Sequence, residues 1–560
     1  MSDKKYIWIL LILFIIIGGY LRFYHIDFPT IGLHNMKENE QISEAKIMLN
    51  GGSWLHSQTY NFWGLESGSF ENNSGAFEEY VQPKILAYMI SIGWVIIGSQ
   101  PVWLPRLIII IFSLISIILM YLLVKKLTEN DYMALLSSFL FAIMPISVFF
   151  GRNIQPDMPA LCFSIASIYF FLRWRESFSK KDIFITMLFL GISALFKETF
   201  LITILPLLFI VPYKRLYDTK FGELCSHIGC GLLGLIPFVA IQEFYTWIVI
   251  DKTKIISESL ILSSSRVVSL SYWTSGIPPL FSYFKDNFTW WFLIMALCGI
   301  VLACIKYKSL IGRLTIGYLI SLIPYCTILS GKLFGHHYYQ LFYLPLICIS
   351  LAYFLFNFGN IIKQLTKLKF VEYLPLIIIP LVFFSFISGQ SSIQASNERM
   401  FGTVFYGQDI AGEWIKEHTL PTDRFFIYGH SQTLAACTFA ERRCGQPWNE
   451  SVDNNMLYLE TVNGPIERME QEFNIRYIEL DLYGLSVAQS SSNWQYIQDN
   501  YKIVWTGFLN VNGQLTPQNF ILKRNGRFNL SDLQDKQPYL ATTYKMSFGD
   551  VPFYVIEVNQ

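Results

Sequence analysis

The sequence predicts an α-helical membrane protein with many transmembrane helices, followed by a soluble α/β domain. Hydrophobic residues make up 53% of the 560 residues and charged residues only 15%, which is too apolar for an ordinary soluble protein. Apolar runs recur as far as residue 389, whereas residues 391–560 have the hydropathy of a domain in water. The formal net charge of +1 argues against a nucleic-acid partner, which would favour a clear basic excess.

The apolar runs predict about eleven transmembrane helices within residues 1–390. Several runs are shorter than the roughly 20 residues that a perpendicular span needs, so their ends are approximate. The predicted spans lie near residues 6–24, 104–124, 133–150, 157–172, 182–197, 199–212, 229–250, 288–305, 311–330, 337–356 and 374–389.

Basic residues between these runs set the expected orientation. Every second connection is basic, as the positive-inside rule requires, provided that residues 83–98 do not cross the membrane. We therefore expect residues 83–98 to form an interfacial or re-entrant helix on the outer face, with a twelfth span as the alternative. The first outer loop is then 25–81. The chain is expected in the plasma membrane, with residues 391–560 outside the cytoplasm. The basic connections contain Lys4/Lys5, Lys125/Lys126, Arg173/Arg175 with Lys180/Lys181, Lys214/Arg215, Lys306/Lys308/Arg313 and Lys363/Lys367/Lys369.

The C-terminal domain shows a mixed pattern. A helix is predicted near residues 410–417, and strands are predicted near residues 424–428, 476–482, 501–508 and 520–523. Cys437 and Cys444 both lie in this domain and are predicted either to form a disulfide or to remain a free pair, depending on the compartment.

A short polar hinge separates two of the apolar runs and carries charged residues at the edge of the membrane. It reads Arg152-Asn153-Ile154-Gln155-Pro156-Asp157. Charges inside the hydrocarbon layer are costly, about 2.5 to 3.5 kcal/mol each at the centre of a helix, so polar partners are expected. Two compatible interpretations follow: Arg152 and Asp157 pair to pin the loop, and Arg152 binds an anionic phosphate while Asp157 orients a nucleophile or its base.

The first outer loop contains a charged segment from His34 to Leu49. Read as a helix, this segment places Glu40 and Glu44 on one face, with Lys37 three positions before Glu40. The segment is either a solvated interfacial helix or the carrier of a catalytic carboxylate at the membrane surface.

Two further segments on the outer face carry candidate binding groups. Gly331 to Gln340 contains Lys332, His336, His337 and Tyr338. Adjacent histidines point in different directions on a helix and no acidic residue lies nearby in sequence, so we expect phosphate or sugar donors here and no metal site. Trp273, in a long outer loop at 251–287, suits sugar stacking. We expect no cofactor, and no motif indicates a divalent metal.

The order of these elements resembles the protein mannosyltransferase / aminoarabinose transferase class of polytopic glycosyltransferases, over about residues 1–390. The resemblance lies in the first helix, the acidic outer loop and a Pro-led apolar stretch that ends in Arg106. It extends to the Gly-Arg-x-x-x-Pro-Asp hinge, the sequence Phe196-Lys197-Glu198-Thr199, and Gly-His-His-Tyr-Tyr followed by Pro345. It implies a GT-C membrane fold, a polyprenyl-phosphate-linked sugar donor and an inverting transfer on the outer or lumenal face.

The same resemblance implies roles for individual residues. The hinge residues Asp157 and Arg152 match the family pattern well. The first loop departs from it, because Lys37-Glu38 stands where an Asp-Glu pair is usual, and a second comparison places the acid at Glu40. The catalytic base is thus Glu38 or Glu40. Gln82-Pro83 stands where Lys-Pro is common, so Lys84 or Lys332 would replace a lysine that binds the donor phosphate.

The expected mechanism needs no nucleotide. Arg152 with His336, His337 or a lysine would balance the leaving phosphate, the glutamate would take the acceptor proton, and Tyr338 and Trp273 would contact sugar or acceptor. Partners are then a polyprenyl-phosphate-linked sugar, membrane lipid, and a glycan, lipid or protein acceptor. A lipid-linked glycan transporter or flippase and a non-catalytic glycan receptor are the alternatives.

Overall fold

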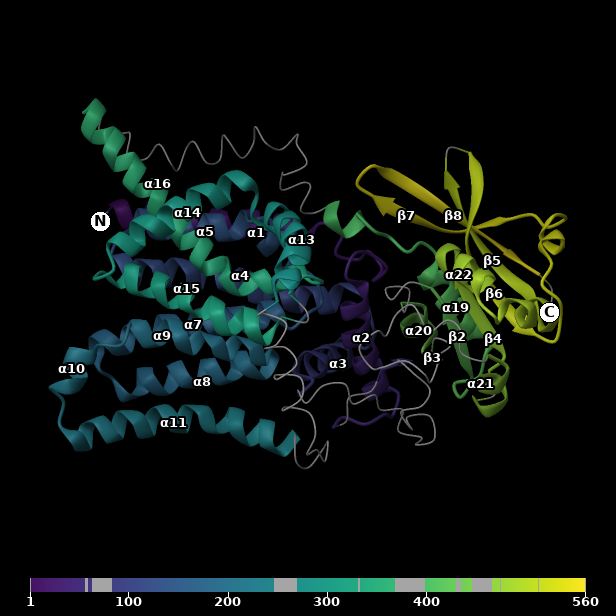
Figure 1. The fold of residues 1–560 in the computed structure, drawn as a ribbon, viewed down its shortest axis with the longest axis horizontal. Helices are drawn as coiled ribbons and strands as arrows, with labels where there is room; N and C mark the ends of the chain where they lie inside the picture. Colours follow the sequence, from purple (N-terminus) through teal and green to yellow (C-terminus); the bar gives the residue numbers. More distant parts are fainter. Residues whose placement is uncertain are drawn as a thin grey trace. The chain divides into compact units, whose positions relative to one another are not determined.

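The computed structural model describes residues 2–55, 59–62, 83–245, 269–330, 333–367, 398–429, 435–445, 466–473, 475–511 and 513–558. The chain divides into two compact units (Figure 1). The first, which we call the helical unit, comprises residues 1–26, 81–85 and 106–397. The second, which we call the sheet unit, comprises residues 27–80, 86–105 and 398–560 and therefore includes the first outer loop.

The helical unit contains the membrane helices. Within the described ranges, five helices are long and apolar enough to cross a membrane, or six if α13 and α14, bent by 94° at Thr289, count as one broken span. The chain is therefore a multi-pass membrane protein of mainly helical structure, as the sequence predicts. Its elements are α1 (Ser2–Phe23), α4 (Trp103–Thr128), α5 (Asp131–Ile143), α6 (Pro145–Phe150), α7 (Asp157–Ser177), α8 (Lys180–Phe196), η1 (Glu198–Thr203), α9 (Ile204–Phe209), α10 (Tyr213–Tyr217), α11 (Phe221–Glu243), α13 (Leu270–Phe288), α14 (Trp290–Ile305), α15 (Leu310–Ile328), η3 (His337–Tyr343) and α16 (Leu344–Thr366).

Some predicted spans are broken helices. The apolar run at 133–150 forms α5 and α6, because Pro145 has no N–H to continue α5 and instead begins α6 at its first position. The run at 199–212 begins as the 3-10 helix η1 and continues as α9. Residues 270–288 form helix α13, where the sequence led us to expect a loop. The predicted span at 374–389 lies outside the described residues.

Arg22 holds several helices of this unit together from a fully buried position near the end of α1. Its guanidinium donates to Ser113 Oγ of α4 at 2.7 Å and to the carbonyl oxygen of Ala142 in α5 at 2.8 Å. It also donates to Ser147 Oγ of α6 at 2.8 Å. Because a buried cation is tolerated only when its donors are bonded, Arg22 fixes where α6 and the following hinge lie.

Helix α3 (Ile85–Ile97) corresponds to the ambiguous apolar stretch at 83–98. Its 13 residues extend about 20 Å, well short of the roughly 30 Å of a bilayer core. One side is buried through Leu86, Ile90 and Trp94, while Val95 and Ile96 are exposed. This length and one-sided burial fit an interfacial helix better than a twelfth span.

The sheet unit is built on an eight-stranded mixed sheet with the order β1-β3-β2-β4-β6-β5-β8-β7. The first four strands in this order run parallel to one another, and the others pair antiparallel. The strands are β1 (Asn61–Phe62), β2 (Arg424–Tyr428), β3 (Arg443–Gly445), β4 (Tyr477–Asp481), β5 (Tyr501–Val511), β6 (Gln514–Arg524), β7 (Tyr539–Met546) and β8 (Gly549–Glu557). The helices are α2 (Asn35–Leu49), α3, α19 (Gln408–His418), α20 (Ala435–Ala440), α21 (Ile466–Phe473), α22 (Leu482–Ser490) and α23 (Trp494–Asn500), with short 3-10 turns η5 (Arg399–Phe401) and η8 (Leu530–Leu533).

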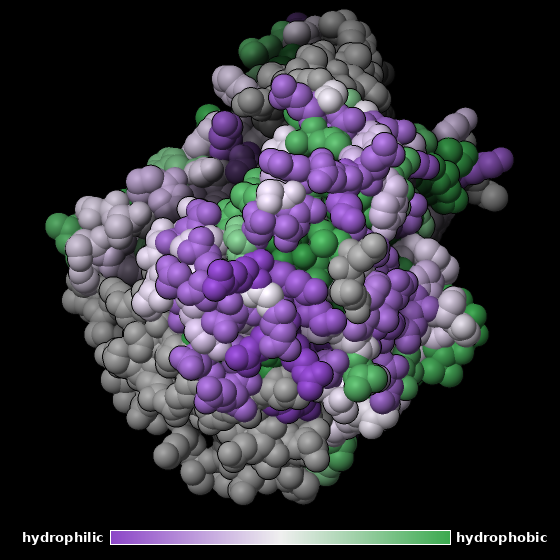
Figure 2. Space-filling model, turned by 90° about the vertical axis from the view of Figure 1, so that its right-hand side faces the viewer, coloured by the Kyte–Doolittle hydropathy of each residue, from purple (hydrophilic) through white to green (hydrophobic). Residues whose placement is uncertain are grey.

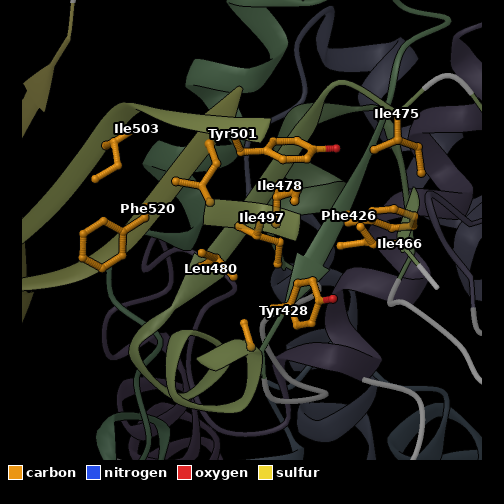
Figure 3. Close-up of a cluster of buried hydrophobic side chains, with 12 residues drawn as sticks. Phe426, Tyr428, Ile466, Ile475, Ile478, Leu480, Ile497, Tyr501, Ile503 and Phe520 are labelled. Carbon is orange, nitrogen blue, oxygen red and sulfur yellow. The ribbon is translucent and has the colours of Figure 1, made fainter. Parts of the chain in front are cut away.

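The core of the sheet unit lies where helices pack on the middle strands (Figure 3). Phe426 from β2, Ile478 from β4 and Ile503 from β5 come together with Ile466 of α21 and Ile497 of α23. The face of this unit seen in Figure 2 is largely hydrophilic, as expected for a domain in water. The predicted helix near 410–417 and the four predicted strands are all present, whereas β1, β3, β7 and β8 are additional.

The first outer loop is part of the sheet unit. Ser43 of α2 and Thr438 of α20 share a hydrogen bond of 2.8 Å, and Lys46 forms an ion pair of 3.1 Å with Glu441. The backbone N–H of Leu33 donates to the carbonyl oxygen of Met400. Strand β1 pairs with β3. Helix α2 is therefore held by residues that follow it by almost 400 positions in the sequence.

Cys437 and Cys444 form a disulfide that joins α20 to β3. Replacing both by serine is expected to lower the free energy of unfolding by about 2.5 kcal/mol, since the bond closes a short loop. Thermal unfolding of the purified protein measures the loss. Serine at Cys225 and Cys298, both free and exposed, is the matched control and should leave the midpoint unchanged. If both double variants unfolded at the same midpoint temperature, a stabilising role of the disulfide would be contradicted.

Asp409, in the first turn of α19, makes the sheet unit sensitive to pH. Burial raises the pKa of Asp409 from 3.8 to about 6, although Tyr544 donates a hydrogen bond of 2.6 Å to its carboxylate. The folded pKa lies above the unfolded one, so this group's contribution is complete below about pH 4 and is lost as the pH rises through 6. The unfolding temperature of the wild type is expected to fall as the pH rises from about 4 to above 6, and Asp409→Asn is expected to reduce this fall. Parallel wild-type and variant profiles would contradict the expectation.

Candidate active site

The polar hinge between α6 and α7 forms one wall of the candidate site. Gly151 ends α6 where no side chain fits, because a Cβ there would lie 2.3 Å from the carbonyl oxygen of Ser147 and 2.6 Å from Nε of Arg22. Six residues after Gly151 the chain enters α7 at Asp157, its first residue. Asp157 thus lies in the first turn of a helix, where the helix dipole favours an acidic side chain.

Asp157 binds Lys197, which caps the C-terminal end of α8. Lys197 Nζ lies 2.5 Å from Asp157 Oδ1, and only 5% of the aspartate side chain and 14% of the lysine side chain are exposed. The backbone of Lys197 is extended, between the end of α8 and the start of η1, so its side chain turns back towards the hinge. A short buried ion pair of this kind resists rearrangement, since either charge alone would be costly to bury.

Two tyrosines complete the surroundings of the Lys197 ammonium. Nζ lies 4.4 Å from the centre of the Tyr338 ring and 4.7 Å from that of Tyr339. These are cation–π distances, and the rings stabilise the positive charge without removing its hydrogen-bonding capacity. The hydroxyl of Tyr325 on α15 donates to the carbonyl oxygen of Tyr339 at 2.8 Å, which fixes the position of η3. Lys197 therefore lies between a carboxylate and two aromatic rings.

Helix α13 holds the histidine-containing segment in place. Asn287 Nδ2 donates to the carbonyl oxygen of His337 at 3.0 Å, and the Tyr283 hydroxyl donates to the carbonyl oxygen of Phe334 at 2.7 Å. The His337 ring lies 5.9 Å from that of Phe150 at the end of α6. His336 stacks on Tyr338 with ring centres 5.1 Å apart. The hinge and both histidines therefore lie close together in the structure.

Trp273 lies on α13, where it makes an edge contact with Phe334 at 6.1 Å. Gly276, one turn further along the helix, lets the Phe334 ring approach, since a Cβ there would overlap it. The sequence predicts that Trp273 contacts sugar or acceptor. The structure places it beside the segment that precedes the histidines.

The side chain of the hinge arginine, Arg152, is buried and bonds to a backbone carbonyl group. Arg152 donates from Nη2 to the carbonyl oxygen of His25 at 2.9 Å, and Arg106 donates to the carbonyl oxygen of Ile26 at 3.0 Å. Both arginines therefore fix the turn that follows α1. Lys84 is also buried, just before α3. Lys332 lies outside the described residues.

The two candidate bases lie on α2 of the sheet unit. Glu38 is buried, and Glu40 forms an ion pair of 2.7 Å with Lys37, the i−3 neighbour expected from the sequence. Asn39, between them, bonds Thr30 through both atoms of its amide group, which fixes the first turn of the helix. Among the described residues, no three His, Cys, Asp or Glu side chains are grouped as in a metal site.

The structure therefore brings Asp157, His336, His337 and Tyr338 together in the helical unit, with Arg152 on the same hinge, and places Glu38 and Glu40 in the sheet unit. It also adds Lys197. Lys197 belongs to the sequence Phe196-Lys197-Glu198-Thr199, which contributes to the family resemblance but had no predicted role. A lysine between two predicted spans is itself a sign of a polar partner.

Comparison with known proteins supports this architecture. Residues 81–242, which include Arg152, Asp157 and Lys197, match the family model described as dolichyl-phosphate-mannose-protein mannosyltransferase. The chain has the GT-C fold of polytopic glycosyltransferases, and its resemblance to the protein mannosyltransferase / aminoarabinose transferase class is confirmed. A search of curated sequences gives no match.

Two solved structures illustrate the fold. The archaeal oligosaccharyltransferase AglB from Archaeoglobus fulgidus, in complex with an inhibitory peptide and a dolichol-phosphate, matches 92% of this chain and 74% of its own, with a TM-score of 0.55 and 13% identity. ArnT from Cupriavidus metallidurans, bound to undecaprenyl phosphate, matches 92% of this chain and 98% of its own, with a TM-score of 0.51 and 12% identity.

Proposed function

We propose that the protein is a membrane glycosyltransferase that moves a sugar from a polyprenyl-phosphate donor to an acceptor hydroxyl, with inversion at the sugar carbon. The reaction takes place on the extracytoplasmic face of the plasma membrane. The observation that carries this proposal is the buried Asp157–Lys197 pair at the hinge, with Tyr338 and Tyr339 against the ammonium. A buried ammonium of this kind can stabilise the negative charge that develops on a leaving group, since electrostatic attraction is strong where the dielectric constant is low.

Lys197 is the group that we assign to the leaving phosphate. A lysine ammonium has three N–H donors, and Asp157 takes one of them, so the others remain for phosphate oxygens. Lys197 thus joins Lys84 and Lys332 as a substitute for the lysine that the sequence pattern lacks. His336 and His337 supply further donors, and Arg152 adds positive charge from the hinge. Asp157 then acts as a positioning residue, which holds Lys197 in place.

The transfer is a single displacement. The acceptor oxygen forms a bond to the anomeric carbon as the bond from that carbon to the phosphate oxygen breaks, and the electron pair leaves with the polyprenyl phosphate. The acceptor proton passes to a carboxylate of α2, Glu38 or Glu40. General-base assistance of this kind typically contributes about 10² to 10⁴-fold. Attack from the side opposite to the phosphate inverts the sugar carbon.

The lipid seen in the structural neighbours supports the choice of donor. ArnT was solved with undecaprenyl phosphate and AglB with a dolichol-phosphate, and both compounds are phosphates of long isoprenoid chains. The sugar and the acceptor, whether glycan, lipid or protein, are left for experiment to identify.

Donor turnover by the full chain in nanodiscs tests the proposal. The purified protein is incubated with a panel of polyprenyl-phosphate sugars, with and without an acceptor extract, and release of free polyprenyl phosphate is measured. Release with one donor, stimulated by acceptor, is the expected result. Passage of intact donor across vesicles without release would instead indicate a transporter, and binding of glycan without release would indicate a receptor.

A further inference from the structure

A cavity of about 1050 Å³ lies in the helical unit at the end of α7 that is far from the hinge. Its walls come from the last turn of α7, from α9 and α10, and from the start of α15. These four helices are labelled in Figure 1. Arg175 lies 18 positions after Asp157 on α7, which corresponds to a rise of about 27 Å, close to the thickness of a bilayer core. The cavity is therefore separate from the candidate active site.

Positive charge dominates the lining of this cavity. Four basic side chains contribute to it, Arg175, Lys214, Arg215 and Arg313, against the acidic Glu176 and Asp218. Glu176 is already bound by Lys126, which lies outside the lining. Its negative charge is thus largely balanced without the cavity arginines.

Arg313 is the group that most clearly lacks a partner. Its side chain is half-buried on the first turns of α15, and its guanidinium makes no hydrogen bond or ion pair within the described part of the chain. Its guanidinium is close enough to that of Arg175 for the two to repel each other. Arg175 has only a carbonyl partner, that of Ile210 at 2.8 Å. Two half-buried guanidinium groups that face one cavity favour an anion between them.

The remaining walls are apolar. Leu208, Phe209 and Ile316 line the cavity, and Leu208 is 48% exposed on the surface of the helix bundle. An inorganic anion would gain nothing from these side chains, whereas an acyl chain would bury apolar surface against them. The basic residues come from three connections that the positive-inside rule assigns to the cytoplasm, where the headgroups of anionic lipids lie.

We propose that this cavity binds one anionic phospholipid of the cytoplasmic leaflet. Arg175 and Arg313 hold its phosphodiester, and one acyl chain lies along Leu208, Phe209 and Ile316. Arg215 holds the C-terminal end of α7 in place, since it donates to the carbonyl oxygen of Glu176 at 2.8 Å and lies over the Phe178 ring. The proposal is independent of the transferase activity and of the sheet unit.

Native mass spectrometry of the full-length protein, titrated with phosphatidylglycerol or phosphatidylcholine, tests the assignment. The wild type is expected to retain one phosphatidylglycerol in preference to phosphatidylcholine. Arg313→Gln is expected to weaken this retention roughly tenfold, because a charge-assisted hydrogen bond is lost. Arg313→Lys keeps the charge and should weaken it less. Millimolar inorganic phosphate should leave the lipid bound.

Arg173→Gln is the matched control. Arg173 lies on the same helix, two residues before Arg175, but it pairs with Asp182 at 3.2 Å and does not line the cavity. The Arg173→Gln variant should retain phosphatidylglycerol as well as the wild type does. Equal retention of both lipids by the wild type, equal losses in Arg173→Gln and Arg313→Gln, or displacement of the lipid by inorganic phosphate would each overturn the proposal.

Discussion

Asp157→Asn is expected to reduce donor turnover by about 100-fold or more while the protein remains folded. The substitution leaves the Lys197 ammonium buried without its carboxylate and removes the contact that directs it towards the leaving phosphate. Loss of one electrostatic contact to a developing charge typically costs about 10² to 10³ in rate. Lys197→Met should lose a similar factor, since the cation itself is then absent. Release of polyprenyl phosphate in nanodiscs measures both effects.

The double variant separates catalysis from stability. If Asp157 and Lys197 act as one unit, the double variant is about as slow as either single variant. Its thermal stability should exceed that of either single variant, because no unpaired buried charge remains. Asp131→Asn, which removes the partly exposed Lys125–Asp131 pair of the same unit, is the control and should keep wild-type turnover. Multiplied losses in the double variant would contradict the shared role.

Glutamine at the carboxylate of α2 that we propose as the base is expected to lower turnover by about 10² to 10⁴-fold, the usual contribution of a general base. Glu38→Gln and Glu40→Gln are compared, and only the variant that removes the base should lose this factor. Turnover against pH adds a second readout, because the acidic limb of the profile should disappear with the base. The amide keeps the size of the side chain, so the fold of α2 should change little.

Two controls accompany this comparison. Lys37→Met removes the ion-pair partner of Glu40 and keeps the carboxylate, so it should alter the pH profile only if Glu40 is the base. Glu467→Gln, at an exposed position of α21, makes the same chemical change elsewhere in the sheet unit and should have no effect. Full turnover in both Glu38→Gln and Glu40→Gln would remove α2 from the mechanism.

The sequence predicted those parts of the fold that depend on local patterns. Strand β2 begins and ends where the run from Arg424 to Tyr428 places it, because consecutive apolar residues there are buried on both faces. The hinge was evident because charged residues within a bilayer need a polar partner. Strand β7 was missed, since most of its side chains are exposed and give no apolar signal.

Other features depend on residues that are distant in sequence. Asp157 pairs with Lys197, which lies 40 positions later in the sequence. Because Arg152 is much nearer in sequence, it was the partner that the sequence pattern indicated. Residues 270–288 read as a loop because Gly276, Pro278 and Pro279 are helix breakers, yet α13 forms with both prolines inside it. Tertiary contacts, such as that of Tyr283 with the Phe334 carbonyl, outweigh the local preference.

The attachment of α2 to α20 has a consequence for the order in which the protein is made. Ser43 leaves the ribosome 395 residues before its partner Thr438, after which β3 must still pair with β1. A nascent chain can therefore insert its membrane helices while α2 contacts α3 through Ser91 but still lacks its partners on α20. On the proposed mechanism, the carboxylate that activates the acceptor is fully held in place only after residues 438–445 have been made, so a polypeptide that stops before them does not consume its lipid-linked donor.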